Sequence, residues 1–323
     1  MAYAMAITAP GGRDQFHRIE IDPPQPGPGE VTLRHTAIGL NFIDVYFRTG
    51  LYPWPVERDL ITGAEAAGVI EAVGEGVSLK PGQRVAYTLP NGAYASHRVV
   101  AADQLVPVPD AISDEVAAAV MLKGLTVHYL IHHSYPVSDG EHVLFHAAAG
   151  GVGLIAGQWL KAKGVTAYGT AGGPEKCKLA KDHGYAQVID YRSEDFVKEV
   201  MDLTGGAGVD AVYDSVGADT LMKSLDVLKR FGTLVSFGQS SGPPDQFKVG
   251  DLTRNSLRLT RPTLFHHTTR PGWLLKAAGE LFEMIGKGAI KIEIAQRFDL
   301  ADVAVAHEAL EGRKTVGSTV LIP

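Results

Sequence analysis

Cysteine is nearly missing from this chain of 323 residues, which contains only Cys177. A single cysteine cannot close an intramolecular disulfide, nor can it supply the four thiolates of a structural zinc site. This usage is typical of a protein from a reducing compartment, and we expect a cytoplasmic location. A chain of this length can bury a large core without such cross-links.

Long apolar runs and a surplus of positive charge are also missing. No stretch of about 18 consecutive apolar residues occurs, so we expect no membrane-spanning helix. The first residues lack the basic segment that begins a signal peptide. With 30 Lys and Arg against 36 Asp and Glu, the formal net charge is −6, which argues against a surface for nucleic acid or anionic lipid.

Two sequence patterns divide the chain. Residues 1–110 consist of short apolar runs between turns rich in proline and glycine, a pattern typical of an all-β, barrel-like lobe. From residue 124 to about residue 260, strand-like runs alternate with helical segments, including helices predicted over 193–203, opened by Ser193, and over 219–228. This alternation indicates βαβ units and a parallel sheet. We therefore predict an α/β fold with two domains, a β-rich lobe formed by residues 1–123 with 262–323 and an inserted Rossmann domain over residues 124–261.

A small-residue turn near residue 150 is the strongest single motif. A strand predicted over 142–146 precedes it and a helix predicted over 151–163 follows it. The turn fits the Gly-x-Gly-x-x-Gly pattern at positions 148, 150 and 153, with alanine at the first. The second glycine would let a pyrophosphate approach the backbone, and the third would let the helix pack closely on the strand. The alternative is a turn needed only for packing. The predicted phosphate-binding residues are Ala148, Gly150, Gly151, Val152 and Gly153.

The second strand of the predicted Rossmann domain, residues 165–170, ends without Asp or Glu. A domain that binds NAD carries an acid there, which accepts a hydrogen bond from the ribose 2′-hydroxyl and would repel a 2′-phosphate. Lys176 supplies a cation at the start of the next helix, and Tyr191 with Arg192 follows the third strand. The sequence therefore predicts NADPH, although Lys176 alone would also suit a solvated helix surface.

Six motifs together resemble one family. With the turn above, the chain resembles the quinone oxidoreductase (zeta-crystallin-like) branch of the medium-chain dehydrogenase/reductase superfamily over essentially its whole length. This resemblance implies a GroES-like β-rich lobe with a Rossmann domain, usually as a homodimer. The other motifs that carry it are Asn41–Tyr46 with Gly50–Pro53, Gly63–Val69, Leu122–Thr126, Tyr213–Gly217 and Ser236–Gly238.

The resemblance also bears on zinc. Zinc-dependent relatives hold a catalytic metal through a Cys in the first lobe and a His in a Gly-His-Glu motif. The matching positions here are Asn41 and Ala64, and neither residue provides a thiolate or an imidazole. We therefore expect a zinc-independent enzyme with no metal ligands.

The resemblance assigns roles to individual residues. Asn41 and Tyr46 line the site near the nicotinamide and are the expected catalytic residues. Asn41 is expected to hold a carbonyl oxygen or a ribose hydroxyl. Tyr46 is expected to donate a proton or hydrogen bond, with water as donor and a packing role for the ring as alternatives. The remaining residues implied to bind the cofactor are Lys123, Thr126, Gly172, Lys176, Tyr191, Ser215, Phe237, Gly238, Gln239, Leu264, Phe265 and Arg313.

The implied activity is hydride transfer from NADPH to a quinone. An NADPH-dependent enone or enal reductase uses the same machinery and is the first alternative. The second alternative is an NADPH-binding protein with a structural or regulatory role and little turnover.

Three further patterns have a plainer interpretation. Gly238–Gly242 matches the Gly-x-Ser-x-Gly elbow of hydrolases, but two prolines follow it, so we expect a loop and no nucleophile. His128 and His132 stand four residues apart without a partner ligand of suitable spacing, and we expect packing or solvated side chains. No motif surrounds Cys177, so we expect an incidental thiol.

Overall fold

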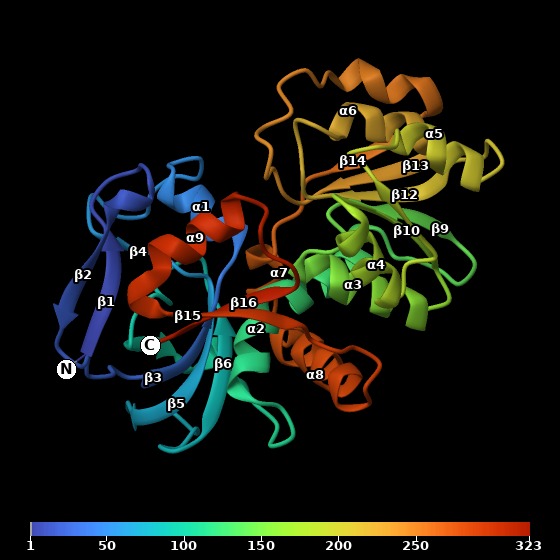
Figure 1. Cartoon of the computed structure of the whole chain (residues 1–323). Coiled ribbons are helices and arrows are strands. Elements are labelled where there is room, and N and C mark those ends of the chain that lie inside the picture. Colours follow the sequence, from blue (N-terminus) through green and yellow to red (C-terminus); the bar gives the residue numbers. More distant parts are fainter. Residues whose placement is uncertain (1) are drawn as a thin grey trace. The chain divides into compact units, whose positions relative to one another are not determined.

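The computed structural model describes residues 2–323 and divides the chain into two compact units. Unit 1 comprises the chain through Leu125 together with Phe265–Gly286 and Ile292–Pro323. Unit 2 comprises Thr126–Leu264 and Lys287–Lys291. Figure 1 shows both units, with the blue and red ends of the chain meeting in unit 1 and the green and yellow segments forming unit 2.

The sheets of unit 1 are mostly antiparallel. One has the strand order β2-β1-β4, and the other has the order β15-β16-β3-β5-β6-β8 with β7 added on β3. Within the second sheet, Val320 of β16 pairs with Gly39 of β3, so the C-terminal strand completes a sheet that early residues begin. The strands are β1 (Ala2–Ile7), β2 (Phe16–Ile21), β3 (Glu30–Gly39), β4 (Leu60–Ile61), β5 (Glu65–Val73), β6 (Arg84–Thr88), β7 (His97–Ala101), β8 (Val106–Pro107), β15 (Ile294–Asp299) and β16 (Ser318–Ile322).

The predicted β-rich lobe is confirmed, and helices cover its sheets. A sheet with an apolar face needs a cover, and Val303 and Ala306 of α9, both fully buried, pack into the same core as Leu33 and Ile38 of β3. The helices are α1 (Phe42–Arg48), α2 (Asp114–Tyr129), which continues into unit 2, α7 (Phe265–Thr268), α8 (Trp273–Gly286) and α9 (Val303–Glu311).

Helix α1 forms despite a poor sequence for it. Its seven residues are rich in β-branched and aromatic side chains, which are weak helix formers. Asp44, in the first turn, accepts a hydrogen bond from the backbone N–H of Asn41 at 2.8 Å. This is the carboxylate half of a capping box, and it defines where the helix begins.

Unit 2 has the topology of a Rossmann domain. Its six parallel strands have the order β11-β10-β9-β12-β13-β14, which in chain order reads 3-2-1-4-5-6. The predicted parallel sheet is therefore confirmed. The strands are β9 (His142–Phe145), β10 (Thr166–Ala171), β11 (Gln187–Asp190), β12 (Val209–Asp214), β13 (Leu228–Ser236) and β14 (Arg258–Thr260). The helices are α3 (Gly151–Ala162), α4 (Pro174–Asp182), α5 (Phe196–Leu203) and α6 (Leu221–Ser224).

Two predicted helices of unit 2 have different bounds. Helix α5 begins at Phe196 and not at Ser193, because Asp195 is its N-cap and accepts from the N–H of Val197 at 2.9 Å. The helix predicted over 219–228 is shorter, because α6 is followed by a 3₁₀ turn and then by β13, which begins at Leu228. The loop expected after β13 in place of a hydrolase elbow is confirmed.

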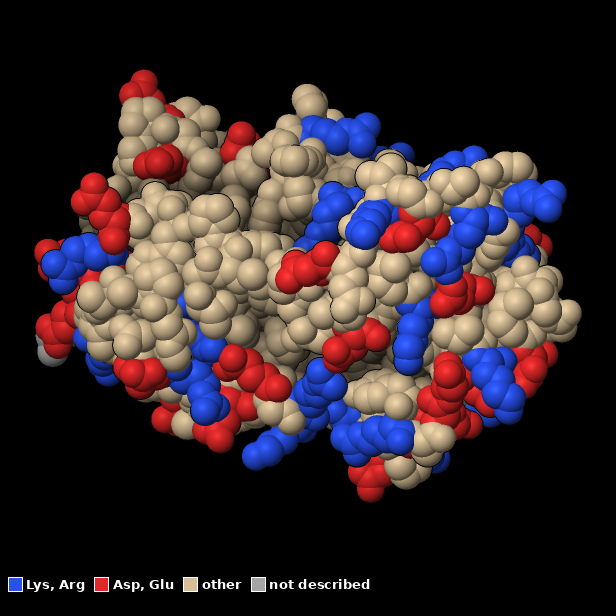
Figure 2. Space-filling view, turned by 90° about the horizontal axis from the view of Figure 1, so that it is seen from above, with Lys and Arg blue, Asp and Glu red and all other residues tan. Residues whose placement is uncertain are grey.

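Charge on the surface is mixed. Figure 2 shows basic and acidic side chains interspersed on the face that it presents. Among residues 2–323, no helix has the length and apolar character needed to cross a membrane.

Candidate functional site

The turn between β9 and α3 has the geometry of a phosphate-binding loop. Strand β9 ends at Phe145, and α3 starts at Gly151 with Gly150 as its N-cap. No side chain of the described residues caps this helix end. The backbone N–H groups of the first turn therefore point out of the helix and can donate to an anion.

The two glycines of this turn meet different needs. A Cβ on Gly153 would lie 2.5 Å from the carbonyl oxygens of both Ala147 and Ala148, so helix packing requires glycine there. A Cβ on Gly150 would meet only the Ala147 oxygen, at 3.3 Å, and its φ of −79° suits any residue. Packing therefore excludes a side chain at Gly153, whereas at Gly150 the Ala147 oxygen would have to shift by only a few tenths of an ångström. A glycine at the second position also lets a ligand approach the backbone closely.

Ala148 holds the turn in place. Its side chain is fully buried, and its N–H donates to the Thr170 carbonyl at 2.9 Å. The preceding residue, Ala147, has a φ of +55°, a left-handed conformation that costs an L-residue about 1–2 kcal/mol. The turn is therefore fastened to β10 and strained at one position.

The end of β10 lacks an acid, but a neighbouring strand brings one to the following loop. Asp190, the last residue of β11, accepts hydrogen bonds through Oδ1 from the N–H of Gly173 at 2.9 Å and of Arg192 at 3.1 Å. Asp190 was not among the predicted site residues, because only the pairing of β11 with β10 brings it beside this loop. This carboxylate joins the two loops in which the predicted 2′-phosphate residues lie.

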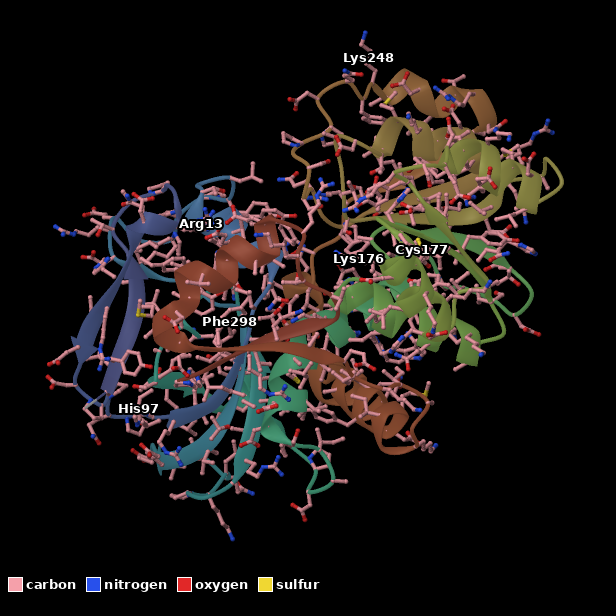
Figure 3. The ribbon with its side chains drawn as sticks, viewed as in Figure 1. Arg13, His97, Lys176, Cys177, Lys248 and Phe298 are labelled. Atoms are coloured by element: carbon pink, nitrogen blue, oxygen red, sulfur yellow. The ribbon has the colours of Figure 1, made fainter. Side chains whose placement is uncertain are left out.

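Donor groups surround this pair of loops. A Cβ on Gly172 would lie 2.5 Å from the Tyr191 hydroxyl and 3.2 Å from Nε of Arg192, so both side chains stand over that glycine. Lys176 is half-buried on the first turns of α4 and appears beside Cys177 in Figure 3. A phenol, a guanidinium and an ammonium on neighbouring segments are donors that suit a phosphate group.

Cys177 is not an activated thiol. Burial raises the pKa of its thiol, and the charges of Asp190 and Glu194 raise it further. A thiol held protonated is a poor nucleophile.

The predicted residues after β12 and β13 also lie together. Asp214, fully buried at the end of β12, accepts through Oδ1 from the N–H of Val216 at 2.7 Å and of Gly217 at 3.1 Å. A Cβ on Gly238 would lie 2.7 Å from the Ser215 carbonyl oxygen, so the two turns touch. Because parallel strands end at the same edge, Ser215, Phe237, Gly238 and Gln239 share an edge with the β9 turn, where the strand order reverses. Thr126 begins unit 2 within α2, and Leu264 ends its main segment.

In unit 1, Glu65 links two predicted residues. This fully buried carboxylate accepts from Nδ2 of Asn41 at 2.8 Å, from Nζ of Lys123 at 2.5 Å and from the N–H of Leu122 at 2.6 Å. Glu65 was not among the predicted site residues. The available signal was a single acid inside the otherwise apolar segment Gly63–Val69.

The bonds of Asn41 define how its amide is oriented. Its Nδ2 lies 2.8 Å from the Glu65 carboxylate and 3.4 Å from the Gly39 carbonyl oxygen, and both of these groups only accept. The amide nitrogen therefore donates both of its hydrogen bonds within the protein. The side-chain oxygen of Asn41 can only accept hydrogen bonds, and its two lone pairs allow it more than one.

The other predicted residues of unit 1 lie on separate elements. Tyr46 is 7% exposed on α1, and its ring packs against those of Phe42 and Tyr52, with ring centroids 6.2 Å and 5.2 Å apart. Phe265 begins α7, and Arg313 follows α9 with a φ of +55°.

The positions that match a zinc site carry no metal ligand. The position matching a zinc-binding His is Ala64, which is fully buried. Across the described part of the chain, no three or more His, Cys, Asp or Glu side chains are grouped so that they could hold a metal ion. His128 and His132 instead stack on each other, with ring centroids 4.5 Å apart, and both pack near Trp159.

Comparisons with known proteins agree with this geometry. The family model "Alcohol dehydrogenase GroES-like domain" matches residues 27–110, and the model "Zinc-binding dehydrogenase" matches residues 151–278. The chain is 50% identical to a quinone oxidoreductase of Pseudomonas aeruginosa over the full length of both, and 42% identical to a 2-haloacrylate reductase of Burkholderia over 100% of this chain and 99% of that protein.

The chain is also similar to a solved structure. The Escherichia coli quinone oxidoreductase complexed with NADPH superposes with a TM-score of 0.96 at 45% identity, over 99% of this chain and 100% of that one. The chain therefore belongs to the medium-chain dehydrogenase/reductase superfamily, in its quinone oxidoreductase (zeta-crystallin-like) branch, and is an oxidoreductase.

Proposed function

We propose that this chain is an NADPH:quinone oxidoreductase that transfers hydride without a metal. The observation that carries the cofactor is the β9–α3 turn, where the start of α3 has no side-chain cap and Gly150 has no side chain to block an approaching phosphate. The similar enzymes named quinone oxidoreductase, one of them complexed with NADPH, support the acceptor and the cofactor.

The residues of unit 2 fit this cofactor. The N-terminus of α3 would take the pyrophosphate through Gly150, Gly151 and Val152. Lys176 on α4 and Tyr191 beside Gly172 would hold the 2′-phosphate, and Arg192 joins them because its guanidinium lies over the same glycine. We propose the following residues as further contacts to the cofactor: Lys123, Thr126, Ser215, Phe237, Gly238, Gln239, Leu264, Phe265 and Arg313.

The bound cofactor supplies a hydride from its nicotinamide ring. Asn41 presents an acceptor oxygen, so it suits a ribose hydroxyl and not the carbonyl oxygen of a substrate, which also accepts. Glu65 keeps that amide in one orientation. Tyr46 donates a hydrogen bond or proton to the reduced oxygen of the acceptor. No Lewis acid is needed, because a reduced quinone is already a stabilised anion.

An alkene reductase is the second candidate. The 2-haloacrylate reductase that is 42% identical to this chain favours it. Hydride addition to a conjugated carbon needs the same cofactor position, and the two candidates differ only in the acceptor.

The proposal extends to the protein as a whole. We propose domains of residues 1–123 with 262–323 and of residues 124–261, which the two compact units support within a few residues at the main junctions. We also propose a cytoplasmic homodimer acting on a small molecule, as the family resemblance implies.

One assay tests the function. Oxidation of NADPH is followed with 1,4-benzoquinone, 9,10-phenanthrenequinone and an enal, with NADH in parallel. We expect turnover with the quinones and a strong preference for NADPH. A higher kcat/KM with the enal would replace the quinone proposal with the alkene reductase, and binding of NADPH without turnover would leave a non-enzymatic role. Stoichiometric zinc in the purified protein would contradict the metal-free proposal.

A further inference from the structure

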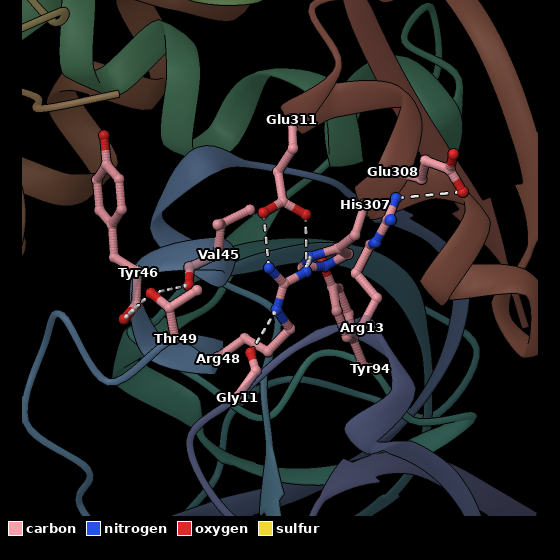
Figure 4. A network of polar contacts seen from close by, with 10 residues as sticks. All are labelled: Gly11, Arg13, Val45, Tyr46, Arg48, Thr49, Tyr94, His307, Glu308 and Glu311. Carbon is pink, nitrogen blue, oxygen red and sulfur yellow. Dashed lines mark hydrogen bonds and ion pairs between the residues drawn. The ribbon is translucent and has the colours of Figure 1, made fainter. Parts of the chain in front are cut away.

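A chain of buried polar groups connects the C-terminal helix of unit 1 with the start of α1. Figure 4 shows its members Arg48, His307 and Tyr94, with Glu311. Arg48 binds Glu311 through two bonds of 2.9 Å and 2.7 Å, and its Nη1 lies 3.1 Å from Nδ1 of His307. The Tyr94 hydroxyl lies 3.0 Å from Nε2 of His307 and 2.8 Å from Oδ2 of Asp44. Asp44, Tyr94 and His307 are fully buried, and Arg48 is 2% exposed.

The direction of these hydrogen bonds follows from chemistry. A guanidinium only donates, so Nδ1 of His307 must accept from Arg48. Burial lowers the pKa of His307 to about 3, and the charge of Arg48 adds to this, so the ring is neutral and its single proton is on Nε2. That N–H donates to the Tyr94 oxygen. The hydroxyl proton of Tyr94 is then directed at Asp44.

Asp44 links this series of hydrogen bonds to Asn41. Its Oδ2 also accepts the backbone N–H of Asn41 at 2.8 Å, while its Oδ1 is buried and has no hydrogen-bond partner among the described residues. A proton on Oδ2 would displace Tyr94, and a proton on Oδ1 would have no acceptor. A carboxylate accepts more strongly than a carboxylic acid, so the polar chain is strongest when Asp44 is ionised.

The surroundings of Asp44 in part disfavour its ionised form. Burial raises the pKa of Asp44 to about 7, and the charge of Glu65 adds to the rise. The bonds from Tyr94 and Asn41 and the charge of Lys123 act in the other direction. The donor from Tyr94 thus helps to keep Asp44 ionised near neutral pH.

The polar chain is not needed merely to dock α9. Val303 and Ala306 already anchor that helix in the apolar core, and the His307 ring packs edge-on against Phe16 with centroids 4.9 Å apart. Buried polar groups are costly unless every member is satisfied, so such a chain is weak evidence for stability alone.

We propose that Tyr94 is a positioning residue for Asn41: it holds the Asp44 carboxylate that binds the Asn41 backbone, and His307 sets the direction in which Tyr94 donates. This inference rests on the proposed function, because the role of Asn41 in binding the cofactor is part of that proposal. Unit 1 contains a matched control, in which Tyr87 bonds to the buried His35 at 3.0 Å and to Arg98 at 3.2 Å.

The test compares Tyr94→Phe and Tyr87→Phe in the full-length enzyme. Each removes one buried hydroxyl and keeps the ring. We expect Tyr94→Phe to lower kcat/KM with NADPH and 9,10-phenanthrenequinone by about tenfold, the usual size for a lost bond to a charged group. The acid limb of its pH profile should move to higher pH, because Asp44 loses a donor that lowers its pKa. Tyr87→Phe should lower the melting temperature without moving the profile.

Binding provides a readout independent of turnover. Titration of NADPH fluorescence should show weaker binding to Tyr94→Phe, whereas 2′,5′-ADP, which lacks the nicotinamide half, should bind as to wild type. Replacing His307 gives a graded series. His307→Gln keeps a donor toward Tyr94 and should stay within about twofold of wild type, and His307→Phe should lose about threefold in kcat/KM.

The outcomes are distinguishable. If Tyr94→Phe only lowers the melting temperature, as Tyr87→Phe does, the polar chain is structural and the inference is overturned. A loss in His307→Gln as large as that in His307→Phe would also overturn it. If Asn41→Ala leaves NADPH affinity and turnover unchanged, the proposed function of Asn41 fails first, independently of Tyr94.

Discussion

The two units place their candidate residues by different means. Unit 2 uses backbone, because the β9–α3 turn offers the N–H groups of an uncapped helix end and depends on Gly153, where a side chain would collide. Unit 1 uses buried side chains, because Asn41 is held by Glu65 and Asp44. Backbone sites should therefore be sensitive to added volume, whereas side-chain networks should be sensitive to protonation and to the loss of a single donor.

The largest expected effect separates the two glycines of unit 2. Gly153→Val forces a side chain into two carbonyl oxygens, and we expect a loss of at least about 3 kcal/mol in the free energy of unfolding, measured by denaturant titration. Gly150→Ala should fold almost normally and yet bind NADPH at least about tenfold more weakly, measured by calorimetry. Equal stability losses in both variants would contradict a ligand-related role for Gly150.

The next largest expected effect is the pH dependence of stability that buried groups of unit 1 produce. Burial lowers the pKa of His35 from 6.5 to about 4, so the unfolded chain takes up a proton below pH 6.5 that the folded chain refuses. This contribution to stability is complete above pH 6.5 and is lost as pH falls toward 4, by about 3 kcal/mol. The contribution of Asp44 to this pH dependence has the opposite sign. Its pKa is raised to about 7, so its contribution to the stability of the folded state grows as pH falls from 7 toward 3.8.

The free energies of unfolding of single variants, measured across this pH range, separate the contributions of His35 and Asp44. His35→Gln should flatten the acid loss of stability relative to its own value at pH 7.5, and Asp44→Asn should steepen it. Parallel curves for wild type and His35→Gln would show that His35 is not the titrating group.

A smaller effect tests the 2′-phosphate site. Lys176→Ala should reduce the ratio of kcat/KM for NADPH over NADH by about tenfold, the usual value for a hydrogen bond to a charged group. Lys178→Ala is the control on the same helix, because that lysine is exposed and paired with Asp182. The same loss in both variants would indicate a general effect of charge.

Asp190 offers a subtler change in the same loop. Asp190→Asn keeps a carbonyl oxygen that can accept from Gly173 and Arg192 but removes the charge. We expect NADPH to bind equally well or a few-fold more tightly, and the pKa of the Cys177 thiol to fall, measured as thiol alkylation rate against pH. Weaker NADPH binding would mean that the charge itself orders the loops.

The smallest effect is at Ala147. Glycine adopts its φ of +55° without strain but gains freedom in the unfolded chain, so Ala147→Gly should change stability by less than about 1 kcal/mol. Thermal unfolding measures this, and a large loss would show that the methyl group packs in the turn.

The same contrast explains what could be predicted from sequence. In unit 2, strands alternate with helices and the turn at Gly150 and Gly153 carries its own signature, so the fold and the loop were predicted from local pattern. In unit 1, α1 has few helix-forming residues and is held by Asp44, a contact within three residues that periodicity does not report. Glu65, Tyr94 and His307 come from distant segments, and only tertiary structure brings them to Asn41 and Asp44.

The predicted start of α5 was wrong for a local reason. Ser193 and Asp195 are both good N-cap residues, and the sequence does not tell which one the chain uses. The acid at Asp190 was overlooked, because a residue at the end of one strand acts on the loop after its neighbour.

The pairing of β16 with β3 has a consequence for biosynthesis. The ribosome releases residues 126–264 of unit 2 as one continuous stretch, but unit 1 lacks an interior strand of its larger sheet until residues 318–322 emerge. During that interval the end of β3, at Ile38 and Gly39, has an open hydrogen-bonding edge, and such edges recruit other strands. Nascent or prematurely terminated chains that carry a folded unit 2 but no β16 are therefore the species of this protein most exposed to aggregation.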